Sequence, residues 1–341
     1  MEFHGGKLTT GKYPGHARIM TTNVNTTANE NGTGTGCIAI IVLNYNKKPD
    51  LMEALESIYE SDYPNFKVVV VDNDSTDGSA DAVADQFPQA HLIRNPENSG
   101  VSKGRNTGWR YAEENYEFDY VIFLDDDTVV TKDFLSKLVE AYRKHPEAGV
   151  LAGKAFTSFE KNQLMSVGIR ANLYTGLVYD LGVGETDEGQ YEEAREIDAA
   201  GGFAFMVRAD LFRELNAFDE RFSPYGWEDV DFSLRAREKG YTVRYVPDAR
   251  LCHKGTKAGR KPKAGYERNK IKNYLYLLKQ HASPLQKVCC VFAVPIKGVY
   301  VVLQMIFSGN ANVITSQFRG FFEGLIKAGR RQKTTEAVLK D

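Results

Sequence analysis

Apolar segments alternate with amphipathic helical patterns between residues 37 and 145, and this alternation restricts the fold more than any other feature. CIAIIVLNYN (37–46) and FKVVVVDNDS (66–75) carry unbroken apolar runs, as expected of strands that are buried on both faces of a parallel sheet. HLIRN (91–95) and YVIFLDDD (120–127) predict two further strands. Because a helical pattern follows each strand, the sequence predicts an α/β fold, a wound sheet with helices on both faces.

The pattern changes in the second half of the chain. Its predicted elements are a hairpin at 164–184, two short strands at 196–212, a helix at 228–239 and strands near 242–253. The two short strands are interrupted by Gly201 and Gly202. Alternation without long helices between strands predicts that the sheet becomes mixed here.

Composition narrows the class of protein. A chain of 341 residues is long enough for one large domain or two ordinary ones. Its formal net charge of −2 gives no indication of nucleic-acid binding. The four cysteines include no CxxC pair and no cluster with His at zinc spacing. We therefore expect a protein of the reducing cytoplasm that does not bind nucleic acid.

Polar and acidic side chains follow three of the predicted strands. Asn44 ends the first strand, Asp72 and Asn73 end the second, and three consecutive carboxylates, Asp125 to Asp127, end the fourth. In parallel α/β sheets, ligands bind beyond the carboxyl ends of the strands. These side chains therefore predict a ligand site at one edge of the sheet.

The triplet of Asp125, Asp126 and Asp127 needs more than a capping role to explain it. Aspartate caps helices and forms turns, which accounts well for Asp74. One cap suffices for the helix after the triplet, so capping leaves adjacent carboxylates unexplained. Hard oxygen ligands at a strand end suit Mg²⁺ or Mn²⁺ shared with a phosphate-bearing substrate.

Five sequence blocks extend this interpretation: IVLNYNKKPDL, VVVVDNDSTDGS, NPENSGVSKGRNTGW, FLDDDT and GWEDVDFSLRAREKGY. In these blocks, in this order, residues 37–255 resemble family 2 glycosyltransferases with the GT-A fold. The resemblance implies a GT-A wound mixed sheet. The branch that the chain resembles is the rhamnosyltransferase-like one, which builds surface polysaccharides.

The resemblance implies a role for the triplet. The family's DxD element falls on Asp125 to Asp127, with Asp127 as a direct metal ligand and Asp125 near the metal or the ribose. His253 lies where several relatives complete the metal site, although a structural histidine is an equally open interpretation. The resemblance implies that Mg²⁺ or Mn²⁺ held there would stabilise the leaving nucleoside diphosphate of the donor as a Lewis acid.

Other blocks imply the remaining donor contacts. VDNDS falls on the nucleobase pocket, and Asn73 stands where many relatives carry Asp, which leaves UDP and dTDP both open. Arg105 lies near a predicted helix N-terminus, which favours anions, with an ordinary surface arginine as the alternative. The implied nucleotide-sugar-binding residues are Asn44, Asp72, Asn73, Gly100, Arg105, Asp125 and Asp126.

GWEDVDF forms a second candidate centre. Glu228 and Asp229 open a helix, where acidic side chains stabilise the dipole in any protein. The resemblance implies instead that Asp229 is the general base of an inverting transfer and that Glu228 orients the base or the acceptor. We place Trp227, Gly201 and Gly202 on the acceptor side, with packing as the open alternative for Trp227.

The C-terminal region predicts contact with a membrane or a partner protein. KGTKAGRKPKAG (254–265) has no acidic residue and is interpreted as a lid over the diphosphate or as a solvated loop. The apolar segment 288–307 is long enough to span a bilayer, but Pro295 and Lys297 favour an interfacial or re-entrant helix, with packing in a soluble protein as the open alternative. The expected location is the cytoplasmic face of the cell membrane. Apolar positions between 318 and 326 form one face of a further helix.

The predicted organisation has three parts: a disordered leader at 1–36, a GT-A catalytic domain at 37–255 with a nucleotide-binding half (37–130) and an acceptor half (131–255), and a basic loop with C-terminal helices at 256–341. The predicted activity is inverting, metal-dependent sugar transfer from a UDP- or dTDP-sugar to a hydroxyl of a glycan or lipid-linked acceptor. Two alternatives stay open. One is a sugar-phosphate nucleotidyltransferase, although the chain has NYNKKPD where such enzymes carry a GxGxR-type loop. The other is a non-catalytic nucleotide-sugar-binding protein.

Overall fold

The computed structural model describes residues 36–255, 264–307 and 314–329. Nearly all of the expected disordered leader and most of the basic loop (256–263) lie outside these residues. Two C-terminal helices, α8 and α9, also contain residues whose side chains are not described, at 296–297, 299–307 and 327–329.

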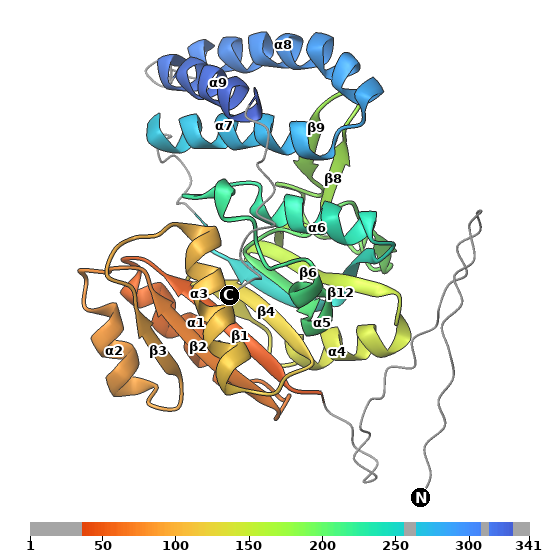
Figure 1. Cartoon of the computed structure of the whole chain (residues 1–341). Coiled ribbons are helices and arrows are strands. Elements are labelled where there is room, and N and C mark those ends of the chain that lie inside the picture. Colours follow the sequence, from red (N-terminus) through yellow and green to blue (C-terminus); the bar gives the residue numbers. More distant parts are fainter. Residues whose placement is uncertain (1–35, 256–263, 308–313, 330–341) are drawn as a thin grey trace, which may run out of the picture. The chain divides into compact units, whose positions relative to one another are not determined.

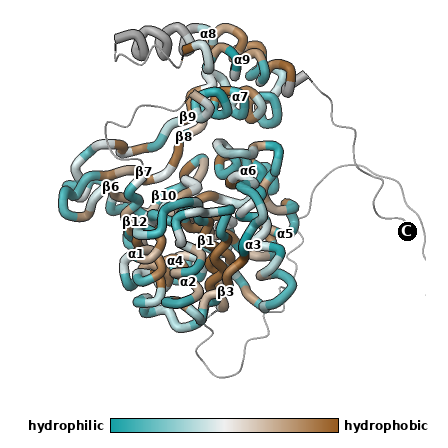
Figure 2. Tube along the Cα trace, turned by 90° about the vertical axis from the view of Figure 1, so that its left-hand side faces the viewer, coloured by the Kyte–Doolittle hydropathy of each residue, from teal (hydrophilic) through white to brown (hydrophobic). Residues whose placement is uncertain are grey.

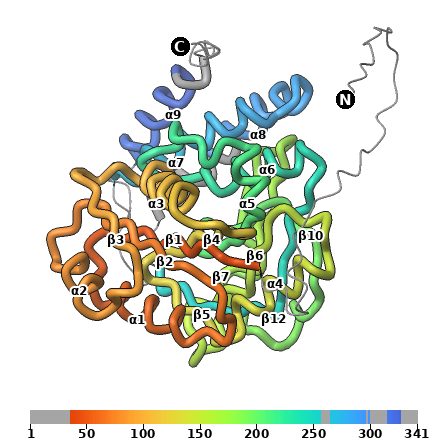
Figure 3. Tube along the Cα trace, turned by 60° about the horizontal axis from the view of Figure 1, so that its bottom comes forward, coloured from red at the N-terminus to blue at the C-terminus, as the bar shows by residue number. Residues whose placement is uncertain are grey.

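Ten strands of the described chain form one mixed sheet (Figure 1). They are β1 (Ile38–Asn44), β2 (Phe66–Asp72), β3 (His91–Arg94), β4 (Tyr120–Asp125), β5 (Thr128–Val130), β6 (Ala148–Ser158), β7 (Gln163–Ser166), β10 (Arg195–Glu196), β11 (Ala204–Arg208) and β12 (Thr242–His253). The main order is β10-β12-β6-β11-β4-β1-β2-β3. Figure 3 shows β1, β2 and β4 between β3 on one side and β6 on the other; β11, which pairs with both β4 and β6, is not labelled there. The strands β1 to β4 are parallel and β11 is antiparallel to both neighbours, which confirms the predicted mixed sheet.

Helices cover both faces of the sheet, as predicted. They are α1 (Lys48–Tyr59), α2 (Ser79–Gln86), α3 (Val101–Asn115), α4 (Phe134–Lys144), α5 (Ala209–Glu214) and α6 (Glu228–Glu238). Along β1, Ile40 and Val42 belong to the core that contains α1, α2 and α4. Ala39 and Ile41 belong to the core that contains α3, α5 and α6. Successive side chains of a strand point to opposite faces, so an unbroken apolar strand fills both cores. Figure 2 shows this concentration of hydrophobic residues in the central strands.

The second half of the chain departs from prediction at more than one point. The strand β6 of the main sheet was not among the predicted elements. The strand expected to reach residue 212 ends at Arg208, and α5 follows directly. Ala209, Leu211 and Phe212 are all buried in the same core. In a strand, Leu211 and Phe212 would point to opposite faces, whereas a helical turn brings both to one face. The predicted hairpin forms outside the main sheet, as β8 (Ile169–Asn172) and β9 (Leu177–Asp180).

Three C-terminal helices follow, α7 (Ala264–His281), α8 (Pro284–Phe307) and α9 (Ile314–Gly329). Leu277 of α7 is fully buried beside Val230 of α6. The Asn273 side chain donates hydrogen bonds to the carbonyls of Phe222 and Tyr225, at 2.5 and 3.0 Å. α7 is therefore fixed to the loop that leads into α6. Among the residues that the structure describes, no helix combines the length and the apolar character needed to cross a bilayer.

Candidate active site

The carboxyl ends of three parallel strands meet at one edge of the sheet. In the strand register, Asn44 lies opposite Asp72, and Leu43 lies opposite Asp125. This register brings the polar strand ends together at one place. The candidate site is built around that edge.

A buried polar network holds the loops at the donor end. Asn44 Nδ2 donates to Asp72 Oδ1 and to Ser79 Oγ, both at 2.8 Å. Asn73 Oδ1 accepts hydrogen bonds from the backbone and hydroxyl of Ser99, both at 3.1 Å. Asn44, Asp72 and Asn73 are buried, and each is bonded to other protein groups. They fix the loops that follow β1 and β2.

Gly100 precedes α3 in a conformation that requires glycine. Its φ is +82°, and a Cβ there would lie 2.6 Å from backbone atoms of Pro224. The first amide of α3, that of Val101, donates to the Pro224 carbonyl at 2.6 Å. This helix terminus is thus joined to the loop that carries the second acidic centre.

Arg105 connects the two acidic centres. Its Nη2 donates to Asp125 Oδ1 at 2.7 Å and to the Gly202 carbonyl at 2.6 Å, and its Nη1 donates to Glu228 Oε1 at 3.3 Å. The side chain is only 2% exposed, so the surface-arginine alternative is wrong. Burial lowers the pKa of Arg105, but Asp125 and Glu228 raise it by more, and the guanidinium stays charged.

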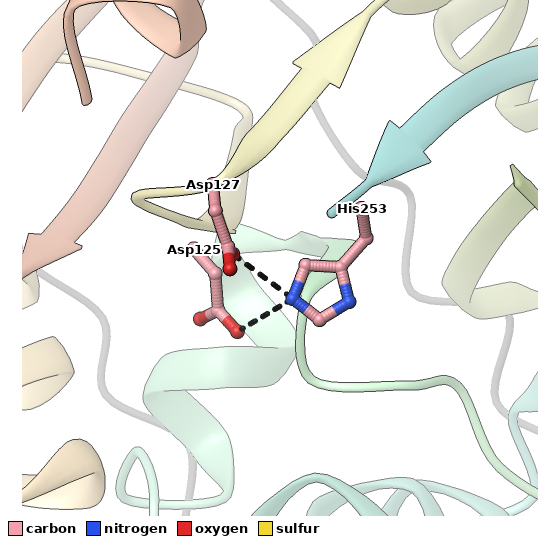
Figure 4. Close-up of side chains that lie close together, drawn as sticks. All are labelled: Asp125, Asp127 and His253. Carbon is pink, nitrogen blue, oxygen red and sulfur yellow. Dashed lines mark ion pairs between the residues drawn. The ribbon is translucent and has the colours of Figure 1, made fainter. Parts of the chain in front are cut away.

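Asp125, Asp127 and His253 form the candidate metal centre (Figure 4). His253 Nε2 lies 3.0 Å from Asp127 Oδ1 and 3.7 Å from Asp125 Oδ2. One ligand atom from each residue lies within 4.8 Å of the others. The ring of His253, at the end of β12, stacks on Phe203 with centroids 4.9 Å apart. Two carboxylates and an imidazole are a suitable donor set for Mn²⁺ and, with more solvent ligands, for Mg²⁺.

Lys47 is a residue of this centre that sequence reasoning missed. Its Nζ lies 2.5 Å from Asp127 Oδ2 and 3.2 Å from Asp126 Oδ1. The other oxygen of Asp126 accepts from the Tyr45 amide at 3.0 Å. The available signal was position, since Lys47 follows the end of β1 at the same sheet edge as the triplet.

Neighbouring charges set the ionisation of this cluster. Burial raises the pKa of Asp126 to about 7, against the opposing effect of Lys47. Burial also raises the pKa of Asp127, but His253 and Lys47 lower it by more, so that it falls well below its usual range. Burial lowers the pKa of His253, and Asp127 and Asp125 more than reverse this effect. The net effect is a raised pKa of His253, whose cause is its contact with the two carboxylates.

The second centre lies at the start of α6. Asp229 Oδ2 accepts from the Gly202 amide at 2.6 Å, and Glu228 Oε2 accepts from the Gly226 amide at 2.8 Å. A Cβ on Gly202 would lie 3.0 Å from Asp229 Oδ2, so a larger residue there would crowd this carboxylate. Glu228 is buried whereas Asp229 is half-buried. Burial first and neighbouring carboxylates second raise the pKa of both groups.

Aromatic side chains line the α7 side of this centre. The Trp227 indole donates to the Lys270 carbonyl at 2.8 Å, and its ring lies 5.4 Å from that of Tyr274. Trp227 therefore packs on α7, as its alternative interpretation held. Tyr225 stacks on Tyr266 of α7 at 4.7 Å. Burial and nearby carboxylates, including Glu228 and Asp229, raise the pKa of Tyr266, which sequence analysis did not single out.

The predicted lid is described only at its edges. Lys254 forms ion pairs with Asp50, at 2.8 Å, and with Glu53, both on α1. The other basic residues of the predicted lid lie outside the described part of the chain. The lid stays a prediction.

Comparison with known proteins identifies a family and several relatives. A family model described as Glycosyl transferase family 2 matches residues 39–215. An N-acetylglucosaminyl-diphospho-decaprenol L-rhamnosyltransferase of Mycobacterium tuberculosis is 26% identical over 267 residues, which cover 73% of this chain and 86% of the relative. The dTDP-rhamnosyl transferase RfbF of Shigella flexneri is 29% identical over 217 residues, which cover 63% and 68% of the two chains.

Solved structures share the fold. The mannosyltransferase PcManGT of Pyrobaculum calidifontis, in complex with GDP-Man and Mn²⁺, superposes with a TM-score of 0.56 at 18% identity, over 86% of this chain and 88% of that one. Residues 1–349 of S. aureus TarS in complex with UDP give a TM-score of 0.51 at 19% identity, over 76% and 70%. These neighbours are GT-A glycosyltransferases, which confirms the predicted fold class.

Proposed function

The chain belongs to glycosyl transferase family 2, and on that premise we propose that it is an inverting, metal-dependent glycosyltransferase. It takes a sugar from a nucleotide-diphospho donor and adds it to a hydroxyl of a glycan or lipid-linked acceptor. The product belongs to a surface polysaccharide or glycoconjugate.

One observation carries this proposal. A single buried guanidinium, that of Arg105, contacts both Asp125 of the metal centre and Glu228 beside the proposed base. The diphosphate end of a donor and the attacking hydroxyl of an acceptor must meet across the anomeric carbon. Two acidic centres held at a fixed separation by one arginine supply that arrangement.

The metal centre holds the donor. Asp125, Asp127 and His253 would bind Mg²⁺ or Mn²⁺, which as a Lewis acid stabilises the charge on the departing nucleoside diphosphate. Arg105 pairs with one oxygen of Asp125 and fixes it, which leaves the oxygen near His253 for coordination.

Asp229 removes the proton. Its carboxylate is half-buried and is oriented by the Gly202 amide. Its pKa is raised, so its ionised form is a stronger base than a solvated aspartate. Glu228, bonded to Arg105 and Gly226, orients the helix terminus that presents Asp229.

The relatives indicate the substrates to test. Two of them are named for rhamnosyl transfer, one with a dTDP-linked donor and one with a diphospho-decaprenol acceptor. We propose dTDP-rhamnose as the first donor and a short-chain N-acetylglucosaminyl diphospholipid as the first acceptor. UDP-sugars form the second donor class.

We also propose that α8 and α9 rest on the cytoplasmic face of a membrane. Their described apolar side chains that are about half exposed or more are Leu285, Val288, Val291, Phe292, Phe318, Phe322, Leu325 and Ile326. Arg319, beside Phe318, is 69% exposed and suits an anionic lipid surface. Replacing Phe318 and Phe322 with Ser should reduce co-sedimentation with anionic vesicles; unchanged co-sedimentation contradicts this contact.

A donor assay tests the enzymatic proposal. Release of nucleoside diphosphate is measured for a panel of dTDP-, UDP- and GDP-sugars with the lipid acceptor, in Mn²⁺ and in EDTA. We expect acceptor-dependent release from one donor, lost in EDTA. Tight binding of a donor without release by any panel member would support the non-catalytic alternative instead.

A further inference from the structure

Lys47 contacts a carboxylate, that of Asp127, to which the proposed function assigns a metal ion. Its ammonium contacts one oxygen each of Asp126 and Asp127, at 3.2 and 2.5 Å. Asp127 is the residue on which His253 also converges, at 3.0 Å. A cation that bound both Asp127 oxygens would have to displace this ammonium.

Two cationic side chains of the protein already pair with the acidic triplet. Arg105 pairs with Asp125, and Lys47 pairs with Asp126 and Asp127. A divalent ion that arrives alone meets carboxylates whose charge is largely neutralised. Its binding is weakened by the free energy needed to break the lysine contacts.

Lys47 is placed so that it can leave, whereas its partners cannot. Its side chain is 38% exposed, but those of Asp126 and Asp127 are 9% and 1% exposed. It lies in the loop between β1 and α1 and carries a flexible four-carbon stem. Arg105, at 2% exposure and bonded on three sides, has no comparable freedom.

We propose that Lys47 is a resident cation that closes the metal centre until a nucleotide diphosphate and a divalent ion bind together. The diphosphate brings new anionic oxygens to the site, and the displaced ammonium pairs with them. This inference deepens the proposed function and rests on its assignment of a metal-dependent, diphosphate-bearing donor. Metal and donor then bind cooperatively, and each raises the affinity of the other by the same factor.

The test compares Mn²⁺ binding to three folded proteins by the loss of the free Mn²⁺ signal in electron paramagnetic resonance. Lys47→Gln removes the ammonium. Lys48→Gln is the matched control, because it removes the same charge one residue further along, and no ion pair with the triplet is formed by Lys48 among the described contacts. Each protein is titrated with Mn²⁺ alone and then in the presence of dTDP.

We expect the Mn²⁺ affinity of Lys47→Gln, without nucleotide, to exceed that of the wild type by at least about tenfold, since a close charge contact to a buried carboxylate is removed. Lys48→Gln should stay within about twofold of the wild type, as expected for a charge that forms no ion pair with the triplet among the described contacts. The enhancement of Mn²⁺ affinity by dTDP should shrink in Lys47→Gln. Equal or weaker Mn²⁺ binding by Lys47→Gln overturns the inference.

A measurement on the wild type avoids dependence on the variant's folding. Amine acetylation at Lys47, relative to Lys48, is followed by mass spectrometry with and without saturating Mn²⁺. Displacement predicts faster modification of Lys47 in Mn²⁺, and an unchanged rate overturns the inference. If no nucleotide binds, the proposed donor is wrong, but the Mn²⁺ comparison still decides the role of Lys47.

Discussion

Replacing Arg105 with Met removes the group that joins the two acidic centres. Methionine retains much of the length and apolar volume of arginine, so the loss is mainly electrostatic. The guanidinium makes three polar contacts, at 2.6, 2.7 and 3.3 Å, from a side chain that is 2% exposed. Removing one partner of a buried ion pair destabilises a protein by about 3–5 kcal/mol.

The assay is urea unfolding followed by fluorescence and circular dichroism. With a slope of about 3 kcal/mol per molar urea, the expected loss lowers the midpoint by roughly 1–1.7 M. Arg110→Met is the control on the same helix, because the Arg110–Glu220 pair is 3.2 Å long but 58% and 38% exposed. We expect the control to lose no more than about 1 kcal/mol.

The pH dependence of this loss gives an independent check. Arg105 lowers the pKa of Glu228, so its removal raises that pKa further above its present value of about 7. At a pH below its pKa, the Glu228 carboxyl of the variant is protonated and carries no unpaired charge. The penalty of Arg105→Met should therefore grow as pH rises from 5 to 8. A penalty equal to that of Arg110→Met, or one independent of pH, would refute the reasoning.

Four further predictions concern catalysis. Asp127→Asn should reduce Mn²⁺-dependent donor turnover by at least about a hundredfold, and wild-type turnover in this variant would remove Asp127 from the metal centre. Asp229→Asn should lower kcat by about 10²–10⁴ while the Kd of the nucleotide, measured by calorimetry, changes little; weakened nucleotide binding would indicate a structural role instead. Burial and like charges raise the pKa of Asp229 and that of Glu228, the latter to about 7. We therefore expect kcat/KM to rise with pH through these raised pKa values and to level off above them. A profile that is flat from pH 5 to 8 contradicts Asp229 as the base. Tyr266→Ala should raise the acceptor KM without changing donor binding. The control, Tyr174→Ala, removes a tyrosine that is 50% exposed in the β8–β9 turn and should leave both quantities unchanged. A change in donor binding in Tyr266→Ala would place this ring on the donor side.

Most of the sheet could be predicted because its signals are local. Buried parallel strands are recognisable in the sequence as apolar runs, and the polar residue that ends each run indicates the sheet edge. The strand predicted at 120–127 ends at Asp125, and the acidic triplet therefore extends into the turn beyond it. The segment 209–212 was mistaken for a strand because a short apolar run has no clear period.

The links between distant segments could not be predicted. Arg105 and Glu228 are 123 residues apart, and the pattern of neither segment specifies that they meet. Lys47 looked like one of two ordinary lysines before a helix. From sequence alone, capping left the adjacent carboxylates unexplained, whereas in the structure Arg105 and Lys47 pair with them. Charge balance is a property of the folded site rather than of a motif.

The most direct test of the central claim is calorimetric binding of dTDP, UDP and GDP to the full-length protein, with and without Mn²⁺. Metal-dependent donor recognition predicts that one nucleotide binds with an affinity that increases markedly in Mn²⁺. Asp127→Asn should lose this increase. Folded wild-type protein that binds none of the three nucleotides, or binds one equally well in EDTA, would contradict the metal-dependent donor site.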